Sequence, residues 1–265
     1  MHSRLCALRF LPLLLGVGLG ALLSACSATY YSANAPNVPV FTEKNEVQFS
    51  AGAGLSNSTR IINFQGAYSA TDHLAFKLNG ARFTNLRDTL VSSDGNYGLN
   101  GNLIEGSVGW YSPLGNDGFA AGFYGGYGYF FGNTNSLELG PAEFGYNRYF
   151  LQPELGFSND LVDIAGSLKT SLVNFNNVNF AFSSLNPEAA NDSYLRSYSA
   201  PVEPENYFFL EPALTFRFGY RFLKVQTQVG SSILLSDQSL DYNFLFISAG
   251  IVFHFKPSYV GKGPL

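Results

Sequence analysis

The sequence has few of the side chains that build catalytic or metal sites. It contains three His, two Cys, one Met and one Trp among 265 residues. His2 and Cys6 lie in the first 25 residues, so only His73, His254 and Cys26 remain in the rest of the chain. These three residues are too few for the usual four ligands of a structural zinc site, and a Gly-x-Ser-x-Gly motif is missing. We therefore predict no metal site, no cofactor and no catalytic residue.

Charged residues are also scarce. They make up 13% of the chain, whereas a soluble domain carries about 25%. Two of the 15 basic residues and none of the 19 acidic residues lie in residues 1–25, so the remainder has a formal charge of −6. This acidic balance excludes the basic surface with which proteins bind nucleic acids.

Long apolar runs are missing after residue 25. No later segment offers 18 consecutive apolar residues, which excludes a further membrane-spanning helix. The chain is nevertheless rich in Phe, Tyr and Gly, with 25, 16 and 28 residues. Since helices and closed barrels are the two structures that satisfy their backbone hydrogen bonds in lipid, this composition indicates a β-barrel.

The first 25 residues have the pattern of a signal peptide. Arg4 and Arg9 precede the apolar run Phe10–Leu23, which is shorter than the roughly 20 residues of a spanning helix. The run ends in Leu23-Ser24-Ala25-Cys26, which resembles the lipobox of bacterial lipoproteins. The resemblance implies cleavage before Cys26, a diacylglycerol on its thiol and an acyl chain such as palmitate on its new N-terminus. The alternative is an ordinary secreted protein in which Cys26 is an unpaired thiol.

From Lys44 onward, apolar and polar residues alternate with a period of two, which is typical of β-strands. In YFFLEPALTFRF (207–218), for example, Glu211 and Arg217 share one face and Leu214 lies on the other. A two-residue turn at Tyr220-Arg221 would bring Arg217 opposite Lys224. The pattern predicts about ten strands, with eight or twelve as alternatives, near 45–54, 60–69, 73–83, 99–111, 119–131, 145–158, 162–175, 207–218, 222–235 and 242–255.

These strands are long enough to cross a bilayer, and short connections between them alternate with longer ones. We therefore predict an all-β fold, an up-and-down antiparallel transmembrane β-barrel in the outer membrane of a Gram-negative cell. One face of the strands carries bulky apolar residues, which we expect to face lipid. A soluble barrel with the two faces reversed is the alternative.

The opposite face is small or polar and carries charges of both signs. We predict that these charges form salt bridges that fill the lumen, because a barrel of about ten strands is too narrow for a wide channel. A narrow path for ions or solutes is the alternative. The predicted interior polar cluster consists of Lys77, Glu105, Glu154, Asp163, Lys169, Glu211, Arg217 and Lys224.

Two segments, NVPVFTEKNEVQFSAG (37–52) and GAYSATDHLAFKLNG (66–80), resemble small outer-membrane β-barrel lipoproteins of Bacteroidota-type bacteria, a largely uncharacterised family. In those proteins an Asn-Val-Pro segment precedes the first strand and a Thr-Asp-His turn joins the second and third. The resemblance implies the architecture and no activity. Some lipoproteins of those bacteria reach the cell surface through an acidic run after the Cys. The segment CSATYYSANA (26–35) has none, which implies an anchor in the periplasmic leaflet.

We therefore expect four parts in the chain. Residues 1–25 are a lipoprotein signal peptide, 26–43 a lipidated Cys with a periplasmic tether, 44–256 the barrel and 257–265 a periplasmic tail. An even number of strands would place both mature termini on the periplasmic side.

The sequence predicts a structural or interaction role for this barrel lipoprotein, and no enzymatic activity. The expected partners are outer-membrane lipids and an unidentified envelope protein, with no nucleic acid. A narrow pore, or a carrier for a small apolar ligand bound near Phe150, Phe209, Phe244 and Phe246, is the alternative. A lipid-modifying enzyme that uses His73 or His254 is the third hypothesis.

Overall fold

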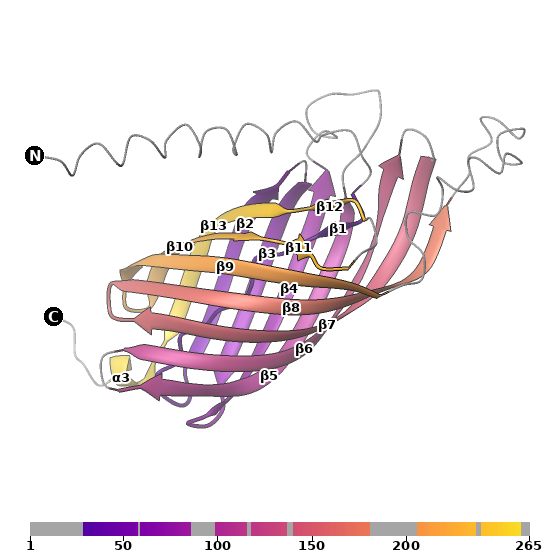
Figure 1. The fold of residues 1–265 in the computed structure, drawn as a ribbon. Coiled ribbons are helices and arrows are strands. Elements are labelled where there is room, and N and C mark those ends of the chain that lie inside the picture. The colour runs from indigo at the N-terminus through magenta and orange to yellow at the C-terminus, as the bar shows by residue number, and fades with distance from the viewer. Residues whose placement is uncertain are drawn as a thin grey trace, which may run out of the picture.

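The computed structural model describes residues 29–57, 59–85, 99–115, 118–136, 140–180, 206–236 and 240–260, and its main feature is one closed β-barrel (Figure 1). Around the barrel the strands follow the order β10-β13-β2-β3-β4-β5-β6-β7-β8-β9, and β9 pairs with β10 to close the wall. The predicted all-β, antiparallel barrel of about ten strands is confirmed. Its strands are β2 (Val47–Ser56), β3 (Thr59–Ser69), β4 (Leu74–Asn85), β5 (Asn100–Leu114), β6 (Phe119–Ser136), β7 (Gly140–Ser158), β8 (Val162–Phe180), β9 (Asn206–Tyr220), β10 (Leu223–Ser231) and β13 (Leu245–Phe255).

Four short elements accompany the wall. β1 (Tyr31–Ser32) and β12 (Tyr242–Asn243) pair in parallel with each other, and β11 (Ile233–Leu234) pairs with β9 beyond the end of β10. The helix α3 (Pro257–Val260) follows the last strand. Within the described ranges, no helix combines the length and the apolar character that crossing a membrane takes.

The connections divide the barrel into two unlike ends. One end, here the turn end, carries the short connections 70–73, 115–118, 159–161 and 221–222. The other, the loop end, carries the connections 57–58, 86–99, 137–139, 181–205 and 232–244. Since β13 ends at Phe255, α3 lies at the turn end, whereas β1 and β12 lie at the loop end (Figure 1).

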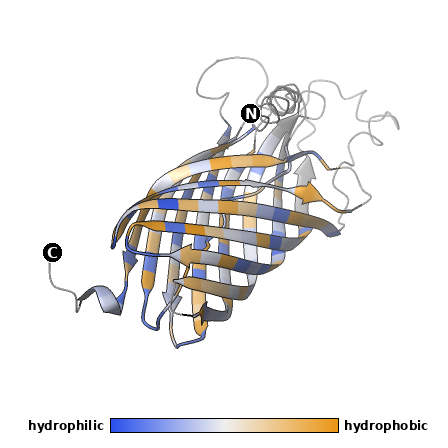
Figure 2. Ribbon diagram, turned by 60° about the vertical axis from the view of Figure 1, so that its left-hand side comes forward, coloured by the Kyte–Doolittle hydropathy of each residue, from blue (hydrophilic) through white to orange (hydrophobic). Residues whose placement is uncertain are grey.

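The two faces of the wall differ as the alternation predicts. Large apolar side chains such as Phe64, Leu78 and Leu214 are more than half exposed and point outward. Their strand neighbours Gln65, Asn79 and Thr215 are buried and point into the lumen. Hydrophobic and hydrophilic residues therefore alternate along the strands (Figure 2). Along the strands that the structure describes, the reversed arrangement of a soluble barrel does not occur.

Glycines on the inner face of β6 make room for larger side chains from the neighbouring strands. A Cβ atom at Gly126 would collide with the ring of Phe150, and one at Gly128 would lie 2.8 Å from Cγ of Glu105. The small inner positions of β6 thus allow bulky and charged groups of β5 and β7 to share a narrow lumen.

The hairpin between β9 and β10 differs from the predicted register. Tyr220 pairs with Leu223, so the two turn residues are Arg221 and Phe222, and Arg221 takes a positive φ of 48°. Arg217 therefore lies opposite Gln226. The shift amounts to two positions on the partner strand, so every side chain keeps its face although its partner changes.

The outward face of β3 supplies a test of the lipid-facing wall. Phe64 lies in the middle of β3 and is 61% exposed, whereas Tyr68 lies on the same face near the turn end. We expect Phe64→Arg to lower the free energy of unfolding in lipid vesicles by about 2–4 kcal/mol, because a cation at the bilayer midplane costs that much. The matched change Tyr68→Arg should cost about 0–1 kcal/mol. Urea titration followed by tryptophan fluorescence measures both, and equal costs would contradict a bilayer around this wall.

Candidate functional site: the filled barrel lumen

The lumen contains a segment of the chain that precedes the barrel. Every residue from Thr29 to Phe41 is buried, and we call this stretch the luminal segment. It enters at the loop end, where β1 pairs with β12 and the Tyr30 amide donates to the Asp241 carbonyl at 2.9 Å. It leaves at the turn end, where Thr42 lies beside the start of β2. Residues 29–41 therefore do not form the tether outside the barrel that the sequence predicts for 26–43.

Side chains of the wall bind the backbone of the luminal segment. The carbonyls of four consecutive residues, Ala35 to Val38, accept hydrogen bonds of 2.8–3.0 Å. Wall strands use their own backbone groups to pair with one another, so an extended segment inside them depends on side chains for its partners. Pro36 and Pro39 lack an N–H and so reduce the number of donors to be satisfied. The donors are Gln65, Gln228, Lys77, Gln152 and Arg217, from β3, β10, β4, β7 and β9 respectively.

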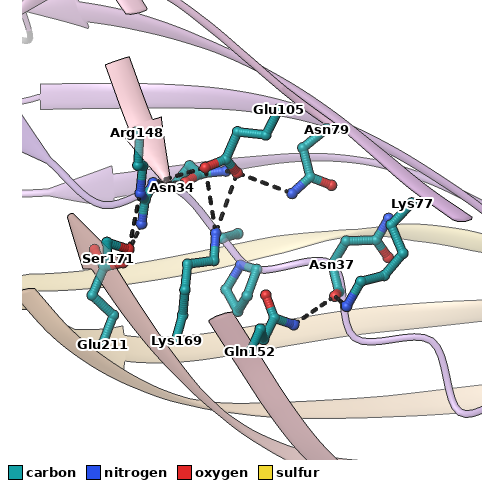
Figure 3. A network of polar contacts seen from close by, with 12 residues as sticks. Asn34, Asn37, Lys77, Asn79, Glu105, Arg148, Gln152, Lys169, Ser171 and Glu211 are labelled. Atoms are coloured by element: carbon teal, nitrogen blue, oxygen red, sulfur yellow. Dashed lines mark hydrogen bonds and ion pairs between the residues drawn. The ribbon is translucent and has the colours of Figure 1, made fainter. Parts of the chain in front are cut away.

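A charged network of Glu105, Arg148, Lys169 and Glu211 lies on the loop-end side of the other luminal ion pairs. Figure 3 shows this network from close by. The Arg148 guanidinium contacts the carboxylates of Glu105, at 3.0 Å, and Glu211. The Lys169 ammonium lies 3.2 Å from Glu105. All four side chains are buried, so each charge would destabilise the fold if it lacked its partners. The two cations and the two carboxylates together carry no net formal charge.

The luminal segment takes part in this network. The Tyr31 hydroxyl donates to Glu211 at 2.6 Å, and the Asn34 amide donates to Glu105 at 3.0 Å. The Asn34 side-chain oxygen accepts from Arg148 at 2.9 Å. The segment thus completes the hydrogen bonding of wall charges as well as receiving hydrogen bonds from the wall.

Two further ion pairs lie toward the turn end. Lys77 contacts Glu154 at 2.9 Å. The same ammonium donates to the carbonyl of Asn37, which lies beside it in Figure 3. Asp163 accepts from Lys224 at 2.7 Å, and the Arg217 guanidinium lies 3.8 Å from the same carboxylate.

The structure places all eight residues of the predicted interior polar cluster among the buried side chains of the lumen. It adds Arg148, which the sequence analysis missed although it shares the inward-facing parity of Gln152 and Glu154 on β7. Cys26 and the predicted signal peptide, residues 1–25, lie outside the described residues.

An aromatic cluster fills the loop end of the lumen. Tyr30 and Tyr31 of the luminal segment pack into a buried group that includes Phe130, Tyr146 and Phe209. The rings of Tyr31 and Phe209 stack with centroids 4.1 Å apart. Phe209 is one of the four residues near which the sequence predicts a small apolar ligand. In the structure its ring packs against Tyr31 of the luminal segment.

A carboxylate secures the exit of the segment at the turn end. Glu46 accepts from the backbone amides of Thr42 and Glu43, both at 2.6 Å, and from His254 at 2.6 Å. Burial alone would raise the pKa of Glu46, but the hydrogen bond from His254 and the nearby charge of Lys256 hold that pKa below its ordinary value. His254 points into the lumen and serves this contact, because its parity on β13 is that of the inward face.

Little free space remains beside the last four residues of the segment. The hollow between Val38–Phe41 and the wall measures about 10 Å³, close to the smallest volume that holds one water molecule. A much larger hollow of about 660 Å³ includes the outward-facing residues Leu155, Leu214 and Leu245 and opens on the outer wall. Among the described residues, no group of three His, Cys, Asp or Glu side chains could hold a metal ion.

The comparisons with known proteins give only distant likenesses. No protein-family model matches the chain, and no curated protein matches its sequence. The N-terminal β-barrel domain of Pseudomonas aeruginosa OprF is 8% identical with a TM-score of 0.33, over 80% of this chain and 98% of that one.

Two channel structures are similarly distant. The TodX monoaromatic hydrocarbon channel, a deltaS2 mutant, is 12% identical with a TM-score of 0.34, over 86% of this chain and 96% of that one. The CymD monoaromatic hydrocarbon channel is 12% identical with a TM-score of 0.33, over 81% and 89%. At these values the likenesses carry nothing about function, and membership of the Bacteroidota-type lipoprotein family stays a prediction.

The pair Lys77–Glu154 tests the energetics of the lumen. We expect Lys77→Met to lower the free energy of unfolding by about 3–5 kcal/mol, because Glu154 and the Asn37 carbonyl would lose a buried partner. The double variant K77M/E154Q also removes the charge of Glu154, which Lys77→Met alone leaves unpaired. It should therefore lower the free energy of unfolding by less than Lys77→Met does. Urea titration of vesicle-embedded protein measures the wild type, the two single variants Lys77→Met and Glu154→Gln, and the double variant. A double variant at least as unstable as the sum of its single changes would contradict a coupled pair.

Proposed function

We propose that this protein is an outer-membrane β-barrel lipoprotein with a structural or interaction role, closed at rest by its own N-terminal segment. The observation that carries the proposal is the filled lumen, in which Thr29–Phe41 occupies the space that a solute would need. The apolar outer wall and the polar interior support a bilayer location, because a transmembrane barrel has this alternation. The lipobox at Leu23–Cys26 supports lipidation.

The unlike ends of the barrel support an orientation. Outer-membrane barrels have short turns on the periplasmic side and longer loops outside. By this rule the connections 70–73, 159–161 and 221–222 face the periplasm, and 86–99 and 181–205 face the exterior. The loop end is then the surface that meets partners from outside the cell.

The contacts of the lumen favour a closed barrel over a standing pore or carrier. The charges that would line an ion path are paired with one another and with the luminal segment. The aromatic residues that would bind an apolar ligand pack against Tyr30 and Tyr31. The two His residues of the enzyme hypothesis are also engaged, since His254 contacts Glu46 and His73 contacts the Tyr111 carbonyl at 3.1 Å.

Planar-bilayer recording tests the closed state. We expect the full mature protein to give no conductance steps, and a variant without residues 30–41 to give them, because the deletion empties a charged lumen. Tyr31→Ala should give brief openings, since it removes the stack on Phe209 and the bond to Glu211. The outward-facing change Tyr220→Ala is the control and should stay closed.

Each variant is first checked for a shift in gel mobility between unheated and boiled samples, which reports a folded barrel. Steady conductance by the full protein, equal to that of the deletion, would contradict the proposal.

A further inference from the structure

The direction in which the luminal segment runs sets the position of the residues before it. Tyr31 and Ser32 pair with Tyr242 and Asn243, which precede β13 at the loop end. The chain then descends through the lumen to Thr42 at the turn end, where β2 begins. Thr29 and Phe255 therefore lie at opposite ends of the barrel, which differs from the prediction that both termini lie on one side.

The length of chain before Thr29 limits where Cys26 can lie. Three residues span at most about 10 Å, whereas the twelve steps from Thr29 to Phe41 span up to about 40 Å when extended. The hydrocarbon core of a bilayer is about 30 Å thick. Cys26 thus cannot reach the leaflet at the turn end while Thr29–Phe41 fills the lumen.

We propose that the barrel threads its own acylated N-terminus through its lumen, so that the lipid on Cys26 lies in the external leaflet at the loop end. This inference rests on the lipidation and orientation in the proposed function. It replaces the anchor in the periplasmic leaflet that the sequence predicts. The protein would then present its lipid-bearing N-terminus beside its long loops, on the cell surface.

The composition of the segment suits passage through a charged lumen. Residues 27–42 contain no charged side chain, so the segment brings no charge that the wall would have to pair. The wall meets it with cations and amides that bind its carbonyls, and with Glu105 and Glu211, which accept from Asn34 and Tyr31.

The charged lining of the lumen also bears on assembly. Buried charges such as those of Lys77, Glu154 and Arg217 would oppose the passage of apolar acyl chains through a closed barrel. We therefore expect the wall strands to close around a segment that is already acylated.

An epitope placed at three positions tests the threading in cells. One insert lies between Ala28 and Thr29, a second after Asn57 at the loop end, and a third after Thr71 at the turn end. Antibody binding is compared between intact and permeabilised cells, and folding is checked by the heat-dependent gel shift. We expect the first two inserts to be labelled on intact cells and the third only after permeabilisation.

Labelling of the Ala28 insert only after permeabilisation, together with the Thr71 insert, would overturn the threading. Labelling of the Thr71 insert alone on intact cells would also overturn it, because the loop end would then face the periplasm. Palmitate incorporation into the wild type and into Cys26→Ser is measured separately. Absence of label on the wild type would reject the lipoprotein part of the proposed function, whereas the epitope pattern reports the path of the chain independently.

Discussion

A closed barrel uses the backbone hydrogen bonds of its wall to hold the wall together, so polar groups inside the lumen depend on side chains for partners. In this protein, side chains of the wall bind the luminal segment, and side chains of the segment bind the wall. Five wall side chains bind four consecutive carbonyls of residues 35–38, and Tyr31 and Asn34 bind two wall carboxylates. The barrel interior and the luminal segment are therefore joined by one hydrogen-bond network, and removal of either would leave these buried groups of the other without their partners.

The alternation of apolar and polar residues predicted most of the wall from the sequence. A period of two assigns each residue to a face regardless of its exact partner. The predicted faces are therefore correct although the predicted register of the hairpin after Tyr220 is wrong by two positions. The same alternation placed eight charged residues on one inward face. The same alternation could also have placed Arg148 in the lumen, since the residue lies on the inward side of β7.

The alternation of apolar and polar residues could not predict the luminal segment, for a physical reason. Five of its hydrogen bonds to the wall are accepted by its carbonyl oxygens, and every residue type has a carbonyl, so no side-chain period marks this part of the segment. Pro36 and Pro39 and the lack of charge over residues 27–42 were the available signals. Both are equally typical of a flexible tether, so only the arrangement in space distinguishes the two.

A cysteine crosslink measures directly where the luminal segment lies. Ser32 and Asn243 are paired across β1 and β12 at the loop end, whereas Ser158 lies at the turn end. In the acylated protein, oxidation should join the pair S32C/N243C and change the mobility of the boiled, unreduced chain, and should leave S32C/S158C unjoined. A bond between positions 32 and 158, with none between 32 and 243, would contradict a segment that enters the lumen at the loop end.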